Sequence, residues 1–146
     1  MGGGIALLNA AQAALRSRFD DFFGAFERRD QAAYRLALTD FHEWLCRWTA
    51  AEERALLPAL TRARLPGRDP QRELTLEYVQ LRELTRHIRM QIEARAPMAD
   101  LLGLVENLSR RFDAHERETV GVYYPAASAL LTPSEWLSLE EASRGF

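Results

Sequence analysis

Two segments of the sequence carry residue types that could bind a metal ion or transfer protons, and the two segments end alike. They are Trp48–Pro58 (WTAAEERALLP) and His115–Pro125 (HERETVGVYYP), each closing on two bulky apolar residues and a proline. Each contains two residues four positions apart that would lie on one face of a helix: Trp48 with Glu52, and His115 with Thr119. An imidazole and a carboxylate at this spacing would be metal ligands. Here one pair lacks the imidazole and the other lacks the carboxylate, which points away from metal chemistry.

The elements that must position these residues are helices. Apolar residues recur at steps of three and four over the ranges 5–29, 31–64, 70–94 and 97–131, and a short last helix is expected over 133–142. Asp30 and Asp69 are suited to capping the second and third helices, and Thr132 opens a capping box. Pro58 and Pro125 fall late in the second and fourth helices, where kinks are expected. No stretch alternates in the way a strand requires.

The predicted core follows from the same periodicity. The first helix would present Leu8, Gln12, Leu15, Phe19, Phe22 and Phe26, and the second Tyr34, Leu38, Phe41, Leu45, Trp48 and Glu52. The third would present Leu74, Tyr78, Leu81, Thr85, Ile88 and Ile92, and the fourth Leu101, Val105, Leu108, Phe112, His115, Thr119 and Val122. These seams and the short connections predict a single domain, residues 1–146. We expect an all-α, antiparallel up-down-up-down four-helix bundle with a short C-terminal helix.

In such a bundle the polar residues of the seams meet in one layer at one end of the core. The expected layer consists of Gln12, Trp48, Glu52, Tyr78, Arg82, His115 and Thr119. A buried carboxylate requires a partner, so we expect Glu52 to pair with Arg82 or with His115. If Trp48 turns inward, its indole N–H needs an acceptor, and Glu52 or Tyr78 is expected to provide it.

Simpler interpretations compete for several of these residues. A single histidine on an apolar face, such as His115, is more often a hydrogen-bonded core residue than a ligand. A helix end open to solvent would also satisfy Glu52. His42 and His87 lie about 100° from their seams and are expected on the surface. Cys46 is expected to be a small apolar filler, and a lone thiol indicates a reducing compartment.

The chain resembles the hemerythrin-like family, the HHE cation-binding domains, over nearly its whole length. The resemblance lies in the turn at Arg29-Asp30, the run from Glu52 to Pro58, the pairs Glu77-Tyr78 and Leu81-Arg82, the segment Phe112–Pro125, and Pro133-Ser134-Glu135-Trp136. In that family a di-iron centre occupies one end of the bundle, held by histidines from all four helices and by carboxylates from the second and fourth.

Carried over to this sequence, the resemblance implies that the metal site is degenerate. The histidine of the first helix falls at or near Gln12, that of the second at Trp48, and that of the third at Tyr78. The fourth histidine is kept as His115. Of the two carboxylates, the one on the second helix is kept as Glu52, whereas Thr119 replaces the one on the fourth. Two ligands of this set remain, so we expect no cofactor, with iron as the alternative.

The composition restricts the partners. The net charge is −2, and the basic residues, all arginine, are spread along the chain, which argues against nucleic-acid binding and favours a bacterial origin. The start of the sequence lacks a signal-like segment, and no apolar run approaches the length of a membrane span. We therefore expect a cytoplasmic protein whose partner is a small molecule or another protein; a homodimer is also compatible with the sequence.

These observations predict a metal-free, non-enzymatic hemerythrin-like bundle with a role in regulation, in partner binding or in binding a small ligand. One alternative is a metal- or haem-binding protein of the same fold that senses or carries oxygen or nitric oxide. A third reading is an enzyme that uses Glu52 and His115 as an acid–base pair, for which the sequence offers neither a nucleophile nor a substrate motif.

Overall fold

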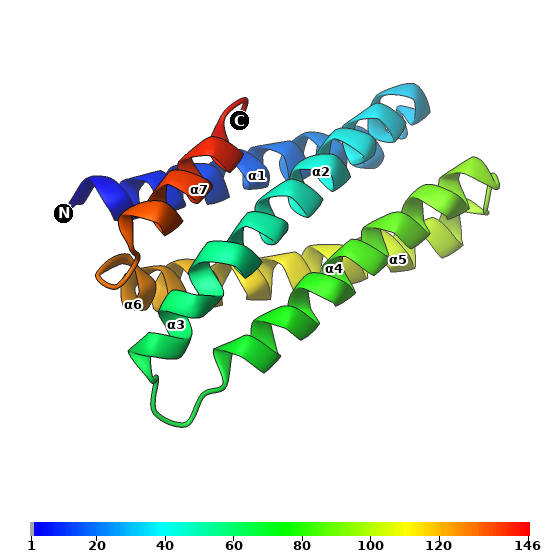
Figure 1. Cartoon of the computed structure of the whole chain (residues 1–146). Helices are drawn as coiled ribbons and strands as arrows, with labels where there is room; N and C mark the ends of the chain where they lie inside the picture. The colour runs from blue at the N-terminus through cyan, green and yellow to red at the C-terminus, as the bar shows by residue number, and fades with distance from the viewer. Residues whose placement is uncertain (1) are drawn as a thin grey trace.

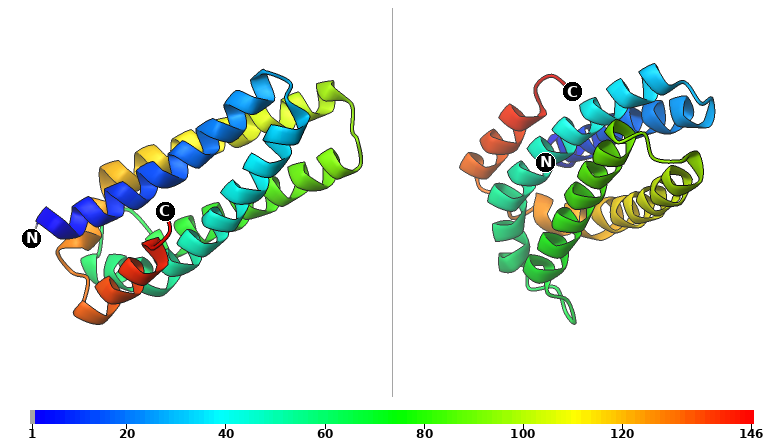
Figure 2. Two further views of the ribbon diagram at one scale, coloured as in Figure 1. Left: turned by 90° about the horizontal axis from the view of Figure 1, so that it is seen from above. Right: turned by 90° about the vertical axis from the view of Figure 1, so that its right-hand side faces the viewer.

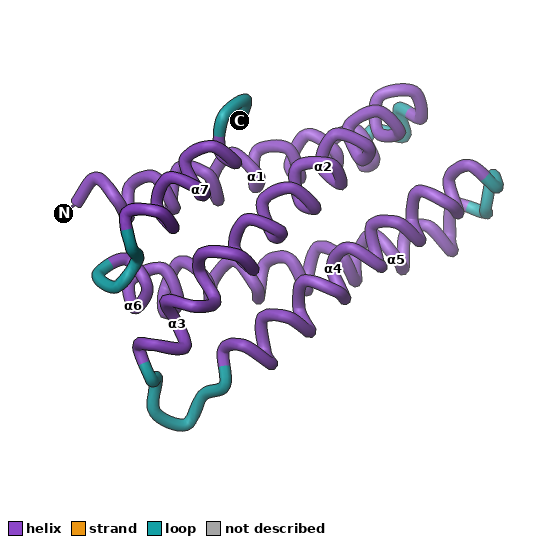
Figure 3. Tube along the Cα trace, in the orientation of Figure 1, coloured by secondary structure: helices purple, strands orange, loops and turns teal. Residues whose placement is uncertain are grey.

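Every regular element in the computed structural model, which describes residues 2–146, is a helix (Figures 1 and 3). The four long helices are α1 (Gly2–Glu27), α2 (Gln31–Ala51), α4 (Pro70–Glu93) and α5 (Met98–Glu118). The prediction of an all-helical chain is confirmed for the described residues. Met1, the first residue of the predicted domain, lies outside them.

Two of the long helices continue through a π-helical turn into a further α-helical segment. After α2 come η1 (Glu52–Leu56) and α3 (Leu57–Ala63); after α5 come η2 (Thr119–Tyr123) and α6 (Tyr124–Ser128). Proline has no N–H, and its ring would clash with the carbonyl four residues earlier in a regular α-helix. Each π turn ends two residues before such a proline, Pro58 or Pro125. The predicted interruptions therefore take the form of one wide turn each.

The helix starts agree with the capping residues in the sequence. The side chain of Asp30 accepts a hydrogen bond from the backbone N–H of Ala33 at 3.2 Å, and that of Asp69 accepts one from Arg72 at 3.3 Å. Thr132 forms both bonds of a capping box with Glu135 and begins α7 (Pro133–Ser143). These side chains satisfy backbone donors that have no partner inside the helix.

The long helices lie along one another (Figure 2), and pairs of contacting side chains give their relative directions. From α2 and η1 to α4, the pairs are Arg35 with Glu93, His42 with Thr85, and Glu53 with Arg82. From α4 to α5, they are Gln80 with Arg111, and Glu77 with His115. In both sets the residue number falls on one helix as it rises on the other. The start of α2 therefore lies beside the end of α4, and the start of α4 lies beside the end of α5.

The buried side chains follow the predicted seams. All predicted core residues of the first three long helices are buried, as are those of α5 up to Thr119. The exception is Val122, which is half-buried, whereas its neighbours Tyr123 and Tyr124 are buried. Among the described residues, no helix combines the length and the apolarity needed to cross a membrane.

Candidate functional site

Trp48 is the centre of the expected polar layer and is completely buried. Its indole Nε1 donates a hydrogen bond to the hydroxyl of Tyr124 at 3.0 Å, and its ring meets Phe146 edge-on. The prediction that Glu52 or Tyr78 would accept this bond is wrong. The acceptor comes from α6 because η2 turns Tyr124 into the core.

Glu52 is also buried, and neither of its carboxyl oxygens makes a hydrogen bond of normal geometry. Burial strongly disfavours the charged form and raises the pKa of Glu52 from its ordinary value of 4.5 to about 8. The nearby hydroxyls of Tyr78 and Tyr124 oppose this increase, and the charge of Glu77 adds to it. At neutral pH, Glu52 is therefore predominantly an uncharged carboxylic acid.

The expected ion pair of Glu52 with Arg82 or His115 is not formed. Arg82, which lies off the seam, instead pairs with Glu53 at 3.0 Å and donates a longer bond of 3.4 Å to Thr49. His115 Nδ1 lies 2.6 Å from Glu77. Because a protonated carboxyl needs no cation, Glu52 can be buried without the partner that a carboxylate would require.

Tyr124 connects this layer to the surface through Gln12. The Tyr124 hydroxyl donates to the side-chain oxygen of Gln12 at 3.5 Å, and the Gln12 amide donates to Glu116 at 3.4 Å. Glu116 in turn receives the guanidinium of Arg16. The path leads from the buried indole of Trp48 to a charged group on the surface of α5, through bonds that are long at both ends of Gln12.

On the α4 side of the layer, both ring nitrogens of His115 lie near protein oxygens, and its ring contacts Tyr78. Besides the Glu77 contact, its Nε2 lies 3.4 Å from the hydroxyl of Thr119, and its ring meets that of Tyr78 edge-on. The Tyr78 hydroxyl is buried without a hydrogen-bond partner; burial, reinforced by Glu52, raises the pKa of this phenol well above its usual range. Both ring nitrogens of His115 are therefore engaged with protein groups.

Six of the seven residues expected in the layer are buried, Arg82 is only half-buried, and the sequence did not point to Tyr124. A regular α-helix continued from Thr119 would turn residues 122 and 123 inward, whereas the extra residue of η2 moves the inward positions to Tyr123 and Tyr124. The signal that could have revealed this was Pro125, which the sequence reading took for a kink.

The layer approaches the solvent at a pocket of about 380 Å³ between α4 and α5. His115 and Glu77 form part of its wall, with Glu73 and Glu118 beside them. Each of the three carboxylates already has a protein partner: Glu77 has His115, Glu73 accepts from Tyr123, and Glu118 pairs with Arg68. The pocket therefore borders the layer without exposing Glu52, whose carboxyl stays closed off in the core.

The remaining chemistry-bearing residues lie elsewhere. His87 is exposed, as predicted, but His42 is half-buried between α2 and α4, with Nδ1 2.6 Å from the Thr85 hydroxyl. The off-seam position of His42 faces the groove between these helices and not open solvent, so the surface prediction is wrong. Cys46 is half-buried one turn along, with its Sγ 3.6 Å from the Nε2 of His42. Burial raises the pKa of the Cys46 thiol, which favours the protonated, less nucleophilic form.

Within residues 2–146, no three side chains of the His, Cys, Asp or Glu type come close enough together to hold a metal ion. Comparison of the chain with protein-family models, with curated proteins and with solved structures found no match in any of the three.

Proposed function

We propose that this protein is a hemerythrin-like, up-down-up-down four-helix bundle that has given up its metal centre and acts as a non-enzymatic, small-ligand-binding protein. The observation that carries the proposal is the packing of the layer where the family holds iron. Trp48 fills it and is hydrogen-bonded to Tyr124, while Glu52 is kept neutral by burial. An indole nitrogen has no free lone pair for a metal ion, so Trp48 cannot complete a ligand pair with Glu52.

The retained ligand positions support the same proposal. Glu52 and His115 are what remains of the family's ligand set, and they do not contact each other as a donor pair. Zinc and iron sites in proteins usually need at least three convergent ligands. The residues present thus do not fit a di-iron centre, and they equally fail to form the acid–base pair that an enzyme would need.

The experiment is elemental analysis and absorption spectroscopy of protein expressed in iron-rich medium. We expect no stoichiometric iron and no charge-transfer band. Two irons per chain would contradict the proposal and favour the oxygen- or nitric-oxide-binding alternative.

A matched positive control restores the family's ligand types. Trp48→His combined with Tyr78→His and Thr119→Glu should raise the iron content above that of the wild type, because it returns imidazole and carboxylate groups to the layer. If this variant folds and the iron content stays unchanged, the comparison with the family's metal site would lose its support.

A further inference from the structure

A large recess lies away from the polar layer, between the first half of α2 and the last turns of α4. It measures about 920 Å³, within the range of small-molecule sites. Its walls combine polar and apolar side chains: Arg35, Leu38, Thr39, Arg86, Arg89, Met90, Ile92, Glu93 and Ala94. We call it the α2–α4 groove.

The charge of the α2–α4 groove is opposite to that of the molecule. Three arginines and one glutamate line it, a surplus of two positive charges, on a chain whose net charge is −2. Arg35 is held by Glu93 through two bonds of 2.7 Å. Arg86 and Arg89, by contrast, form no ion pair or side-chain hydrogen bond within residues 2–146. Two guanidinium groups are therefore left to receive an anion.

The influence of these arginines extends along the groove. The pKa of His42, which lies beyond the groove on α2, is lowered first by burial and then by the charge of Arg89. Glu43 opposes this decrease, and Arg86 adds a lesser contribution to it. A second, smaller recess shares Arg86 with the groove and is lined by His42, Cys46 and Arg82 among others. The positive charge of the arginines is therefore felt beyond the groove, at His42.

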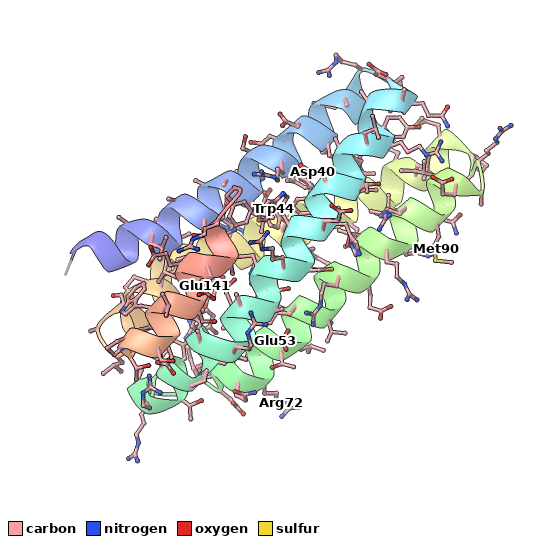
Figure 4. All side chains as sticks on the ribbon, turned by 45° about the horizontal axis from the view of Figure 1, so that its top comes forward. Asp40, Trp44, Glu53, Arg72, Met90 and Glu141 are labelled. Atoms are coloured by element: carbon pink, nitrogen blue, oxygen red, sulfur yellow. The ribbon has the colours of Figure 1, made fainter. Side chains whose placement is uncertain are left out.

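The floor and rim of the groove are apolar. Leu38 and Ile92 are buried core residues that form its floor, and Met90 stands at its rim with 57% of its surface exposed. Figure 4 shows Met90 projecting outward near the end of α4 opposite to Arg72. A methionine side chain is flexible and adapts to apolar ligands of differing shape.

We infer that the α2–α4 groove binds an amphipathic organic anion, a molecule with a carboxylate or phosphate head and an apolar body. The guanidinium forks of Arg86 and Arg89 match the oxygen pairs of such a head group, while Leu38, Ile92 and Met90 cover the body. The pocket beside His115 is a weaker candidate because its carboxylates already have partners. This inference rests on the proposed small-ligand-binding function. It adds that the ligand is an amphipathic anion and that the binding site is the α2–α4 groove.

The test is calorimetric titration of the full chain with laurate. We expect saturable binding of about one laurate per chain, and at least tenfold weaker binding in Arg86→Gln/Arg89→Gln, because charged hydrogen bonds to the head group are lost. The matched control is Arg72→Gln/Arg110→Gln, which removes the same charge from exposed positions outside the groove. It should bind laurate within about twofold of the wild type.

Several outcomes would overturn the inference. They are no laurate binding by the wild type, equal weakening in both double variants, or inorganic phosphate binding as tightly as laurate. If the Arg86/Arg89 variant fails to fold, NMR of the wild type still tests the site. Laurate should shift the methyl signal of Met90, and an unchanged signal at saturation would exclude the groove as the laurate-binding site. Dodecyl phosphate alongside laurate distinguishes a phosphate from a carboxylate head.

The two proposals fail separately. Iron in the elemental analysis together with intact laurate binding would overturn only the metal-free function. Iron-free protein that does not bind laurate would overturn only the groove.

Discussion

Trp48 and Glu52 show how single residues can turn a polar layer into a core. The indole supplies volume and apolar area, and its one polar atom is satisfied by Tyr124. Glu52 avoids a buried charge by carrying a proton, while its carboxyl oxygens stay without a hydrogen-bond partner. A buried ion pair costs two desolvation penalties, whereas a neutral acid costs about as much as any buried polar group. Protonation therefore lets Glu52 be buried without an ion pair.

Replacing Trp48 tests this packing. Trp48→Ala should destabilise the protein by about 3–5 kcal/mol, since it leaves a cavity and removes the donor to Tyr124. Trp48 is fully buried, whereas Trp44 and Trp136 are half-buried. The part of the tryptophan fluorescence that is blue-shifted and shielded from quenchers should therefore disappear in Trp48→Ala. Urea unfolding and iodide quenching measure both effects, and Trp48→Phe should lose less stability than Trp48→Ala. A wild-type spectrum in which every tryptophan is water-accessible would contradict the packing.

Glu52 makes stability depend on pH in a defined direction. Its pKa is about 8 in the folded state against an ordinary 4.5, so the folded protein binds this proton more tightly than the unfolded chain. The stabilising contribution of the bound proton of Glu52 to the free energy of unfolding is complete below about pH 4.5 and is lost as the pH rises toward about 8. Between about pH 5 and about pH 7.5 the loss should be about 3 kcal/mol.

Urea unfolding across this pH range measures how steeply the free energy of unfolding falls with pH. Glu52→Gln should flatten this dependence, because an amide does not titrate, whereas Glu77→Gln should leave most of it because desolvation is the main cause of the shift. Equal slopes in the wild type and Glu52→Gln would show that Glu52 is charged or solvated in the folded protein.

At the scale of the helix, the regular spacing of apolar residues predicted which residues are buried, but the positions of the π turns could not be predicted from it. The three-and-four spacing located the buried face of each long helix, and Asp30, Asp69 and Thr132 located three helix starts. Spacing alone could not find the partner of Trp48, because η2 shifts the downstream face by one residue. Nor could it show that Glu52 would be buried as a neutral acid, since protonation depends on the whole surrounding packing.

The docking of α7 depends on a close approach to α1. A Cβ added at Gly4 would lie 2.6 Å from the ring of Trp136, whereas one added at Gly103, on α5, meets nothing within 4 Å. Gly4→Ala should therefore destabilise the protein by about 1–3 kcal/mol through overpacking. Gly103→Ala should stabilise it by up to about 1 kcal/mol through helix propensity. Thermal unfolding of the two variants compares them directly, and a stabilising Gly4→Ala would show that α7 does not rest on α1.

At the scale of the molecule, one cluster of buried side chains draws on every long helix and on α7. It extends from Leu8 in α1 through Phe41 and Phe112 to Leu139 and Ala142 near the C-terminal end. The aromatic rings of Phe19, Phe41 and Phe112 meet within it, at centroid distances of 5.2–5.4 Å. Arginines spread along the sequence are nevertheless gathered by α2 and α4 into one positive groove, an arrangement that composition alone does not reveal.

A continuous core predicts cooperative unfolding of the chain as one domain. Far-ultraviolet circular dichroism and tryptophan fluorescence should give coincident urea transitions, since the tryptophans of α2 and α7 report on the same core as the helix signal. The folded spectrum should show well over half helix. Two separated transitions, or a helix signal that outlasts the fluorescence change, would contradict the single domain.

The two π turns also affect how this chain should be aligned with others. An extra residue in a helix turns everything after it by about 100°. An alignment without gaps that keeps the α-helical step beyond Thr119 would therefore match Val122 to core positions of other bundles and displace Tyr124. A one-residue gap opposite η2, and another opposite η1, would restore the correspondence of the buried positions. In such an alignment, the LLP and YYP segments form a sequence motif that can be used to search for distant sequences with the same buried core.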